Sequence, residues 1–274
     1  MESQVRLTDR MAAKKHICVL TIAGSDSGAG AGVQADARTI HALGGYALTA
    51  ITAVTAQNGR GISVWKAMAP RLIAAQAAAV LEGFPVKAVK TGLLPNAGTI
   101  RVIVKALAGH PSLPLIVDPV IGSTGGTRFL SGAGVRALRR ELFPRAMLIT
   151  PNWPEAEALT GLRVRSAAQA ETAALKLLET GCRAALVKGG HGRGKSCRDC
   201  VAVAGGKIRW FDGPRIATRN THGTGCVLSA AIAVELARGE EIGRAVEKAR
   251  RFLLKSLRKN RSVRWQGSGP AFAG

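Results

Sequence analysis

Apolar runs of strand length alternate with segments of helical periodicity along most of the chain. Short runs rich in apolar and β-branched residues predict strands at 17–23, 46–56, 86–90, 115–117, 147–150 and 184–187, then a hairpin at 201–204 and 207–211 that turns at Gly205-Gly206. Helical patterns lie at 33–43, 72–81, 99–107, 133–142 and 167–180, and two further helices begin at Cys226 and Ile242. Repeated strand–helix units predict an α/β fold with a mostly parallel central sheet covered by helices on both faces.

Polar side chains follow several of these strands at the point where each strand ends. They are Asp26, Gln57, Lys90, Asp118 and Asn152. Ligands of parallel α/β sheets bind beyond the carboxyl ends of the strands. The pattern therefore predicts a binding site at this edge of the sheet.

A glycine-rich turn at 220–225 precedes the apolar stretch from Cys226 to Ala237. A turn that opens a helix leaves backbone N–H groups without partners, and the helix dipole adds positive charge there. Gly223, Thr224 and Gly225 are therefore predicted to form an anion site. Cys226 falls in the first turn, where the same field favours a thiolate. The alternative is a plain turn before a core helix with an inert cysteine.

A second glycine-rich turn, at 24–32, follows the first strand. It lacks the Gly-Lys-Ser/Thr of a phosphate-binding P-loop, and its glycines at every second position do not form a convincing dinucleotide fingerprint. The turn is expected to bring bare backbone close to a small ligand, with Asp26 and Asp36 nearby. The alternative is a flexible loop.

Three shorter motifs carry weaker predictions. Asn152 and Glu155 follow a strand and suit a hydrated Mg²⁺, although the same pair is also typical of a helix N-terminus. Lys188 begins Lys-Gly-Gly-His and suits nucleotide phosphates. Cys197 and Cys200 form a lone C-x-x-C, and a metal role is disfavoured because a structural zinc site needs four ligands.

The length of 274 residues and the absence of a Pro- or Ser-rich linker favour one large domain at 16–260, with a disordered extension at 1–15 and a flexible tail at 261–274. No apolar run is long enough to span a bilayer, and the polar first 15 residues do not form a secretory signal. Five scattered cysteines favour free thiols in a reducing cytoplasm.

The net charge of +22 comes from 39 Lys and Arg against 17 Asp and Glu. Such a charge attracts nucleotides and phosphorylated substrates, and also nucleic acid and anionic membranes. Much of it lies at 244–264, which is predicted to be an amphipathic surface helix with a solvated basic face. Nucleic acid is disfavoured as a partner because no recognised binding motif accompanies the charge.

Seven segments, collinear between residues 17 and 237, read AGSDSGAGAGVQAD, TAVTAQNGRG, VKTGLL, VDPV, ITPNWPEA, VKGGH and NTHGTGCVLSAA. Together they resemble the hydroxymethylpyrimidine/phosphomethylpyrimidine kinases of thiamine biosynthesis, members of the ribokinase-like superfamily. The resemblance implies a three-layer α/β/α ribokinase-like fold. It also implies ATP-dependent phosphorylation of 4-amino-5-hydroxymethyl-2-methylpyrimidine, first to the monophosphate and then to the diphosphate, by a cytoplasmic homodimer.

The resemblance also assigns roles to residues. Gln57 would hydrogen-bond the aminopyrimidine ring in a pocket shaped by Gly24, Ala31, Leu93 and Val120, with Asp36 among the substrate-binding residues. Asn152 and Glu155 would organise Mg²⁺ through water, and Lys188 with Thr221 would contact ATP. Gly223, Thr224 and Gly225 would form the anion hole, and Cys226 would be the catalytic base.

Two other functions compete with this one. A pyridoxal kinase would share the fold and the cysteine, and a kinase scaffold that has lost activity would use the basic tail on nucleic acid. The chain also departs from the family pattern: Leu93 stands where methionine is expected, the segment 121–126 lacks the lysine that relatives often carry, and the basic stretch beyond Ala237 matches no family motif.

Overall fold

The computed structural model describes residues 16–123, 125–192 and 194–272, and the extension expected at 1–15 lies outside them. One nine-stranded sheet runs in the order β3-β2-β1-β4-β5-β6-β7-β8-β9. The strands are β1 (Ile17–Asp26), β2 (Gly45–Asn58), β3 (Gly61–Ala67), β4 (Val86–Thr91), β5 (Leu115–Val117), β6 (Leu148–Ile149), β7 (Ala184–Val187), β8 (Ser196–Val203) and β9 (Arg209–Pro214). The pairs β2–β3, β7–β8 and β8–β9 are antiparallel, and the others are parallel.

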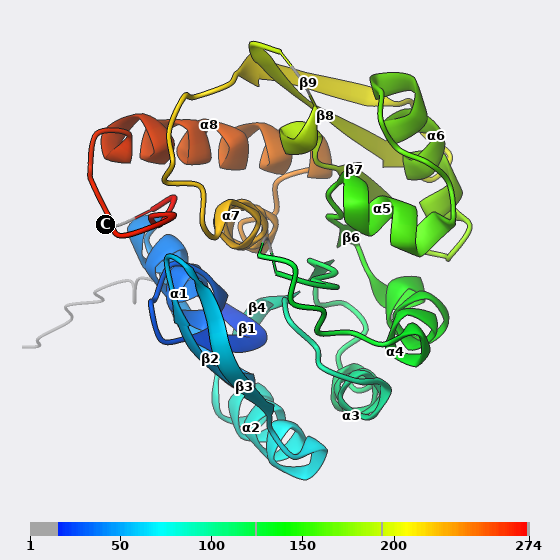
Figure 1. Ribbon diagram of the computed structural model, residues 1–274. Coiled ribbons are helices and arrows are strands. Elements are labelled where there is room, and N and C mark those ends of the chain that lie inside the picture. Colours follow the sequence, from blue (N-terminus) through cyan, green and yellow to red (C-terminus); the bar gives the residue numbers. More distant parts are fainter. Residues whose placement is uncertain (1–15, 124, 193, 273–274) are drawn as a thin grey trace, which may run out of the picture.

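Helices cover both faces of this sheet, so the predicted three-layer α/β/α architecture is confirmed (Figure 1). The helices are α1 (Gly32–Ala42), α2 (Pro70–Gly83), α3 (Ala97–Leu107), α4 (Gly132–Ala137), α5 (Trp153–Thr160), α6 (Ala167–Leu178), α7 (Thr224–Ala237) and α8 (Ile242–Asn260). Helices α2 to α6 contribute to one apolar core, and α1, α7 and α8 contribute to the core on the opposite face. Strand side chains alternate between the two cores because successive residues of a strand point to opposite faces.

Helix α7 lies at the centre of its layer, and its ten residues from Val227 to Leu236 are all buried. It is apolar on every side because it packs between the sheet, α1 and α8. Within the described ranges, no helix has the combined length and apolar character needed to cross a bilayer.

The structure adds features that the hydrophobic pattern did not predict. Strand β3 is largely exposed, so its side chains carry little of the alternation that marks a half-buried strand. The helix expected at 133–142 begins as α4 and continues as a π-helical turn over Leu138–Leu142. Strand β8 also begins five residues earlier than expected, at Ser196.

Residues 261–272 differ from the flexible tail that we expected. The His222 N–H donates to the Gly269 carbonyl at 3.0 Å, and the Ala271 N–H donates to the His222 carbonyl at 2.9 Å. Ala271 is fully buried, and the Phe272 ring packs edge-on against Phe252 with 5.3 Å between centroids. A short apolar end has no periodicity to reveal that it docks, which is why the pattern missed it. We call residues 266–272 the C-terminal strap.

Candidate active site

The carboxyl ends of the central strands bring the predicted polar residues to one edge of the sheet. Asp26 is the last residue of β1, Gln57 lies at the end of β2, and Lys90 lies at the end of β4. Asp118 directly follows β5, and its N–H donates to the Thr91 carbonyl at 2.9 Å. The topology therefore assembles the site where parallel sheets bind ligands.

The glycine turn before α7 faces this edge. Gly223 adopts a left-handed conformation with φ 78° and ψ 12°, and α7 begins at Thr224. A side chain at Gly223 would overlap the Gly30 carbonyl, so the two glycine-rich turns pack directly against each other. Gly225 lies close to the Lys188 ammonium and the Asp118 carboxylate. The Thr224 N–H donates to the Thr221 carbonyl at 3.2 Å, which leaves the N–H groups of Gly223 and Gly225, beside the lysine, to form the predicted anion site.

A buried ion pair lies beneath the site. Lys90 Nζ is 2.7 Å from Asp36 Oδ2, and both side chains are completely buried. The Thr21 hydroxyl donates to the same carboxylate oxygen at 2.6 Å. Burial alone would lower the pKa of Lys90, but Asp36, Cys226 and Asp118 raise that pKa above its usual value, so the ammonium stays charged.

This placement corrects the role predicted for Asp36. Its side chain is sealed under the site by Lys90 and Thr21, and we find no exposed carboxylate surface that a substrate could contact. Asp36 instead holds Lys90 in place below Cys226. The sequence showed only that an aspartate follows the glycine turn, and it did not show which face of α1 carries it.

Cys226 also departs from expectation. Burial raises the pKa of the Cys226 thiol to about 11; Lys90 opposes this rise, while Asp36 and Asp118 add to it. The position at a helix start favours the thiolate, but the loss of solvent and the two carboxylates outweigh it. The resting side chain is therefore a thiol at neutral pH.

A second charged group lies on the α7 side of the sheet edge. Lys188 Nζ is 2.8 Å from Asp118 Oδ1, and the Thr150 hydroxyl donates to that oxygen at 2.9 Å. Burial would raise the pKa of Asp118, but Lys188 and Lys90 lower it, so the carboxylate is ionised. Lys188 is thus held at the mouth of the anion turn by Asp118.

Asn152 and Glu155 form a reciprocal helix cap at the start of α5, as the alternative interpretation predicted. The Asn152 side chain accepts from the Glu155 N–H at 2.9 Å, and Glu155 Oε2 accepts from the Asn152 N–H at 2.8 Å. Burial and the nearby Asp118 raise the pKa of Glu155 to about 7, although Lys188 opposes the rise. A buried carboxylate with a raised pKa is stabilised when a cation binds beside it.

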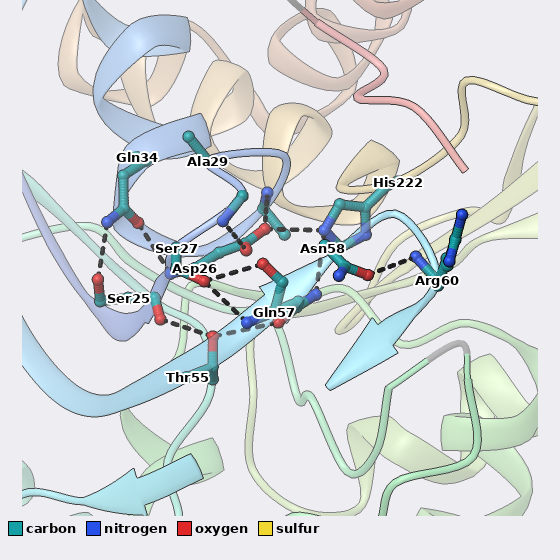
Figure 2. A network of polar contacts seen from close by, with 12 residues as sticks. Ser25, Asp26, Ser27, Ala29, Gln34, Thr55, Gln57, Asn58, Arg60 and His222 are labelled. Carbon is teal, nitrogen blue, oxygen red and sulfur yellow. Dashed lines mark hydrogen bonds and ion pairs between the residues drawn. The ribbon is translucent and has the colours of Figure 1, made fainter. Parts of the chain in front are cut away.

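A third group of polar side chains, Asp26, His222 and Gln57, lies at the same edge of the sheet. They point toward one another from β1, the α7 turn and β2 (Figure 2). His222 Nε2 lies 2.8 Å from Asp26 Oδ2 and 3.1 Å from Gln57 Nε2. Asp26 also accepts from the Gly28 and Ala31 N–H groups, each at 2.8 Å. The aspartate therefore organises the glycine turn and anchors the histidine.

A small apolar cluster lies beside these polar groups. It contains Ala53, Leu93 and Phe129, with Ile62, Trp65 and Val120 packed against it. A side chain at Gly24 would come within 2.9 Å of Leu93, so the bare backbone of β1 borders the same cluster. Of the five residues predicted to form the ring pocket, Gly24, Leu93 and Val120 gather here, and Ala31 and Gln57 lie around Asp26.

Sequence reasoning gave no role to His222. It placed Asp26 at a strand end and beside the glycine-rich turn, and it named Lys90 and Asp118 only as strand-end residues. A lysine that ends a buried strand was the available signal for Lys90. The C-x-x-C pair lies on β8, where residues three apart point to opposite faces, and Cys200 is buried while Cys197 is half-buried. Over the described residues, no group of three or more His, Cys, Asp or Glu could hold a metal ion.

Comparison with solved structures places this architecture in a known fold class. The chain superposes on the pyridoxal kinase of Bacillus subtilis, solved as an ADP complex, with a TM-score of 0.82 and 32% identity over 88% of this chain and 92% of that one. The central sheet, its two helical layers and the site at its carboxyl edge thus define a ribokinase-like protein.

Sequence comparison identifies the family within this class. The family model for phosphomethylpyrimidine kinase matches residues 26–271. A hydroxymethylpyrimidine/phosphomethylpyrimidine kinase of Haemophilus influenzae is 41% identical over 92% of this chain and 94% of its own length. The chain belongs to the phosphomethylpyrimidine kinase family. A thiamine biosynthesis bifunctional protein of Geobacter sulfurreducens is also 41% identical over 92% of this chain. This chain spans about half (51%) of the length of that relative.

Proposed function

We propose that this protein transfers the γ-phosphoryl group of ATP to the hydroxymethyl group of 4-amino-5-hydroxymethyl-2-methylpyrimidine, and then phosphorylates the monophosphate to the diphosphate. The observation that carries the proposal is the meeting, at one sheet edge, of a cluster of polar and apolar side chains with an anion turn. Gln57 and Leu93 border the first, and Gly223 with Lys188 border the second.

The Gln57 amide explains the choice of ring. An amide offers a hydrogen-bond acceptor and a donor side by side. An aminopyrimidine offers the complementary pair, an exocyclic amine and the adjacent ring nitrogen. The half-buried Gln57 side chain would form both bonds while Leu93 and Val120 would contact the ring.

The chemical step depends mostly on positioning and charge. Phosphoryl transfer passes through a loose transition state whose charge spreads over the equatorial oxygens. The N–H groups of Gly223 and Gly225 and the Lys188 ammonium would stabilise that charge. Cys226 would take the hydroxyl proton, for which its thiol must first ionise; the Lys90 ammonium and the Gly32 N–H are the groups that lower its pKa.

Magnesium fits the oxygen-rich side of this site, with Asn152 and Glu155 as the residues that would hold it through water. Glu155 is a buried carboxylate whose pKa rises to about 7 where no cation is bound. Mg²⁺ keeps several waters and binds through one or two carboxylates together with substrate phosphates. When bound, it would neutralise phosphate charge. The described residues supply too few acidic ligands for a cage made of protein alone.

The test is an incubation of the purified protein with Mg-ATP and either the aminopyrimidine or pyridoxal, with products identified by mass spectrometry. We expect the pyrimidine mono- and diphosphates. Pyridoxal phosphate alone would assign the second candidate function, which the likeness to the B. subtilis pyridoxal kinase favours. No product with either acceptor would favour a binding scaffold, and a salt-dependent DNA-shift assay would then test nucleic acid as its ligand.

We also propose that the protein works as a cytoplasmic homodimer. The support for a dimer is a group of exposed apolar side chains on β2, β3 and α2, next to the open edge of the sheet. They are Tyr46, Val54, Val64, Leu72 and Phe84. Exposed edge strands are usually covered, so sedimentation of Val64→Lys against wild type tests this interface. Five free cysteines suit a reducing compartment.

A further inference from the structure

His222 makes contacts that the proposed function leaves unexplained. Its ring nitrogen Nε2 lies between the Asp26 carboxylate, at 2.8 Å, and the Gln57 amide, at 3.1 Å (Figure 2). Its backbone is held on both sides by the C-terminal strap, through Gly269 and Ala271. His222 thus links Gln57, which its imidazole contacts, to a segment more than 200 residues further along the chain, which its backbone contacts.

The Asp26 contact determines where the imidazole proton lies. An ionised carboxylate accepts hydrogen bonds and donates none. Asp26 is ionised, because burial raises its pKa but the hydrogen bonds from His222, Ala31 and Gly28 lower it below its usual value. At 2.8 Å from this carboxylate, His222 Nε2 must carry a hydrogen.

That hydrogen in turn determines which end of the Gln57 amide faces the imidazole. A protonated ring nitrogen cannot accept a bond from an amide N–H, whereas it can share its hydrogen with an amide oxygen. The oxygen and nitrogen of an amide exchange places by a half-turn, and the hydrogen-bond network decides between the two arrangements. The network is satisfied when the Gln57 oxygen faces His222 and its nitrogen faces Thr55.

Thr55 favours the same order more weakly. Its hydroxyl lies 3.3 Å from the Gln57 amide and 3.0 Å from the Ser25 carbonyl. The Ser25 carbonyl can only accept, so the hydroxyl gives it its one hydrogen and acts as an acceptor toward the amide. Thr55 therefore favours the same arrangement at the longer distance of 3.3 Å, and His222 is the nearer of the two groups that set it.

We propose that His222 is a positioning residue that fixes the orientation of the Gln57 amide and thereby selects the hydrogen-bonding pattern of the acceptor ring. The inference rests on the proposed role of Gln57 in ring binding. With its orientation fixed, the amide keeps one free lone pair on the His222 side and one free N–H on the Thr55 side. That edge accepts a 4-amino ring, which presents a donor and then an acceptor, and rejects a 4-oxo ring, which presents the reverse.

The C-terminal strap and the residues before it hold His222 in position. The Ser268 N–H donates to the Gly59 carbonyl at 2.7 Å, so the strap is attached to the β2–β3 hairpin as well as to His222. The buried Asn220 side chain donates to the Asn260 and Val263 carbonyls at 2.6 and 2.8 Å. The backbone of the α7 turn is therefore fixed against residues 260–271 on one side of the site.

The experiment compares the dissociation constants of the 4-amino substrate and its 4-oxo analogue by calorimetry without nucleotide. The proteins are wild type, His222→Leu, His222→Gln and His41→Leu. Leucine fills the space without a hydrogen bond, and glutamine restores an N–H. His41 is an exposed histidine at the end of α1 and serves as the control.

We expect wild type and His41→Leu to prefer the 4-amino ring at least about tenfold, as for a good pair of hydrogen bonds. His222→Leu should lose part of this preference because only the longer Thr55 contact then holds the amide, and His222→Gln should regain it. The KM for Mg-ATP should stay within twofold in all four proteins. Equal weakening of both rings in His222→Leu, with the preference unchanged, would overturn the positioning role. Failure of wild type to bind the 4-amino ring would instead overturn the proposed function, and this inference with it.

Discussion

Replacing Gly223 by alanine tests whether the two glycine-rich turns form one rigid site. Two effects act at this position. The left-handed backbone, with φ 78°, costs an alanine about 1–2 kcal/mol. The added methyl would also overlap the Gly30 carbonyl and lie 3.1 Å from the Ala31 Cα, and displacing a packed backbone costs about a further 1–3 kcal/mol.

Gly239 separates these two effects. It is also left-handed, with φ 87°, but a methyl there would meet no atom within 4 Å. Gly239→Ala should therefore lose about 1–2 kcal/mol of unfolding free energy and keep its activity. Gly223→Ala should lose about 2–5 kcal/mol, the sum of both effects. It should also lose about 100-fold or more in kcat, because the N–H donors of the anion turn move away from the phosphoryl group.

Urea unfolding and initial-rate kinetics on the two variants measure both quantities. A Gly223→Ala protein that matches Gly239→Ala in stability and in kcat would refute the reasoning, since the close approach of Gly30 would then have no energetic consequence. Loss of stability with full activity would show that the turn is structural and that the anion site lies elsewhere.

Three further perturbations follow from the charged groups. Lys90→Met should lower the unfolding free energy by about 3–5 kcal/mol because it leaves Asp36 buried and unpaired, and adding Asp36→Leu should restore most of that free energy. Urea midpoints that do not recover in the double variant would argue against a dominant ion pair. If the Cys226 thiolate is the base, its pKa of about 11 means that kcat for phosphorylation of the alcohol should rise about tenfold per pH unit between pH 7 and 9. A pH profile that is flat over this range would assign the proton transfer to another group. Cys226→Ser should impair phosphorylation of the alcohol more than phosphorylation of the monophosphate. Glu155 binds a proton more tightly in the folded protein, with a pKa of about 7, than in the unfolded chain, so its contribution to stability is complete below about pH 4.5 and is lost as the pH rises to about 7. Glu155→Gln should remove this decline in unfolding free energy, and a wild-type curve with no decline over that range would contradict the burial argument.

The central architecture could be predicted because parallel strands buried on both faces leave a strong apolar signal, as in 17–23 and 184–187. Placing Asp26, Gln57, Lys90 and Asp118 at strand ends also predicted one edge of the sheet as the site. The pattern could not show how deeply residues lie: Asp36 is fully buried and Cys226 is half-buried, and the loss of solvent reverses the expected ionisation of the thiol.

The contacts of His222 could not be predicted for a different reason. They depend on the distance between residues that are close in space and far apart in sequence, such as Asp26, Gln57 and Gly269. Neither periodicity nor a local motif records such pairs. The strap is a similar case, because a few apolar residues near Phe272 carry no pattern until their position beside Phe252 is known.

The position of the strap has a consequence for the newly made chain. The strap reaches back from Gly269 to bond His222 and, through Ser268, the β2–β3 hairpin, so the ribosome must add over 200 residues after Gln57 before the site is held together. At about 5–20 residues per second, this interval is on the order of 10–40 s. Throughout that time the β2–β3 hairpin has been made but the C-terminal strap has not. A nascent chain should therefore be unable to select its acceptor ring until the strap has emerged and docked.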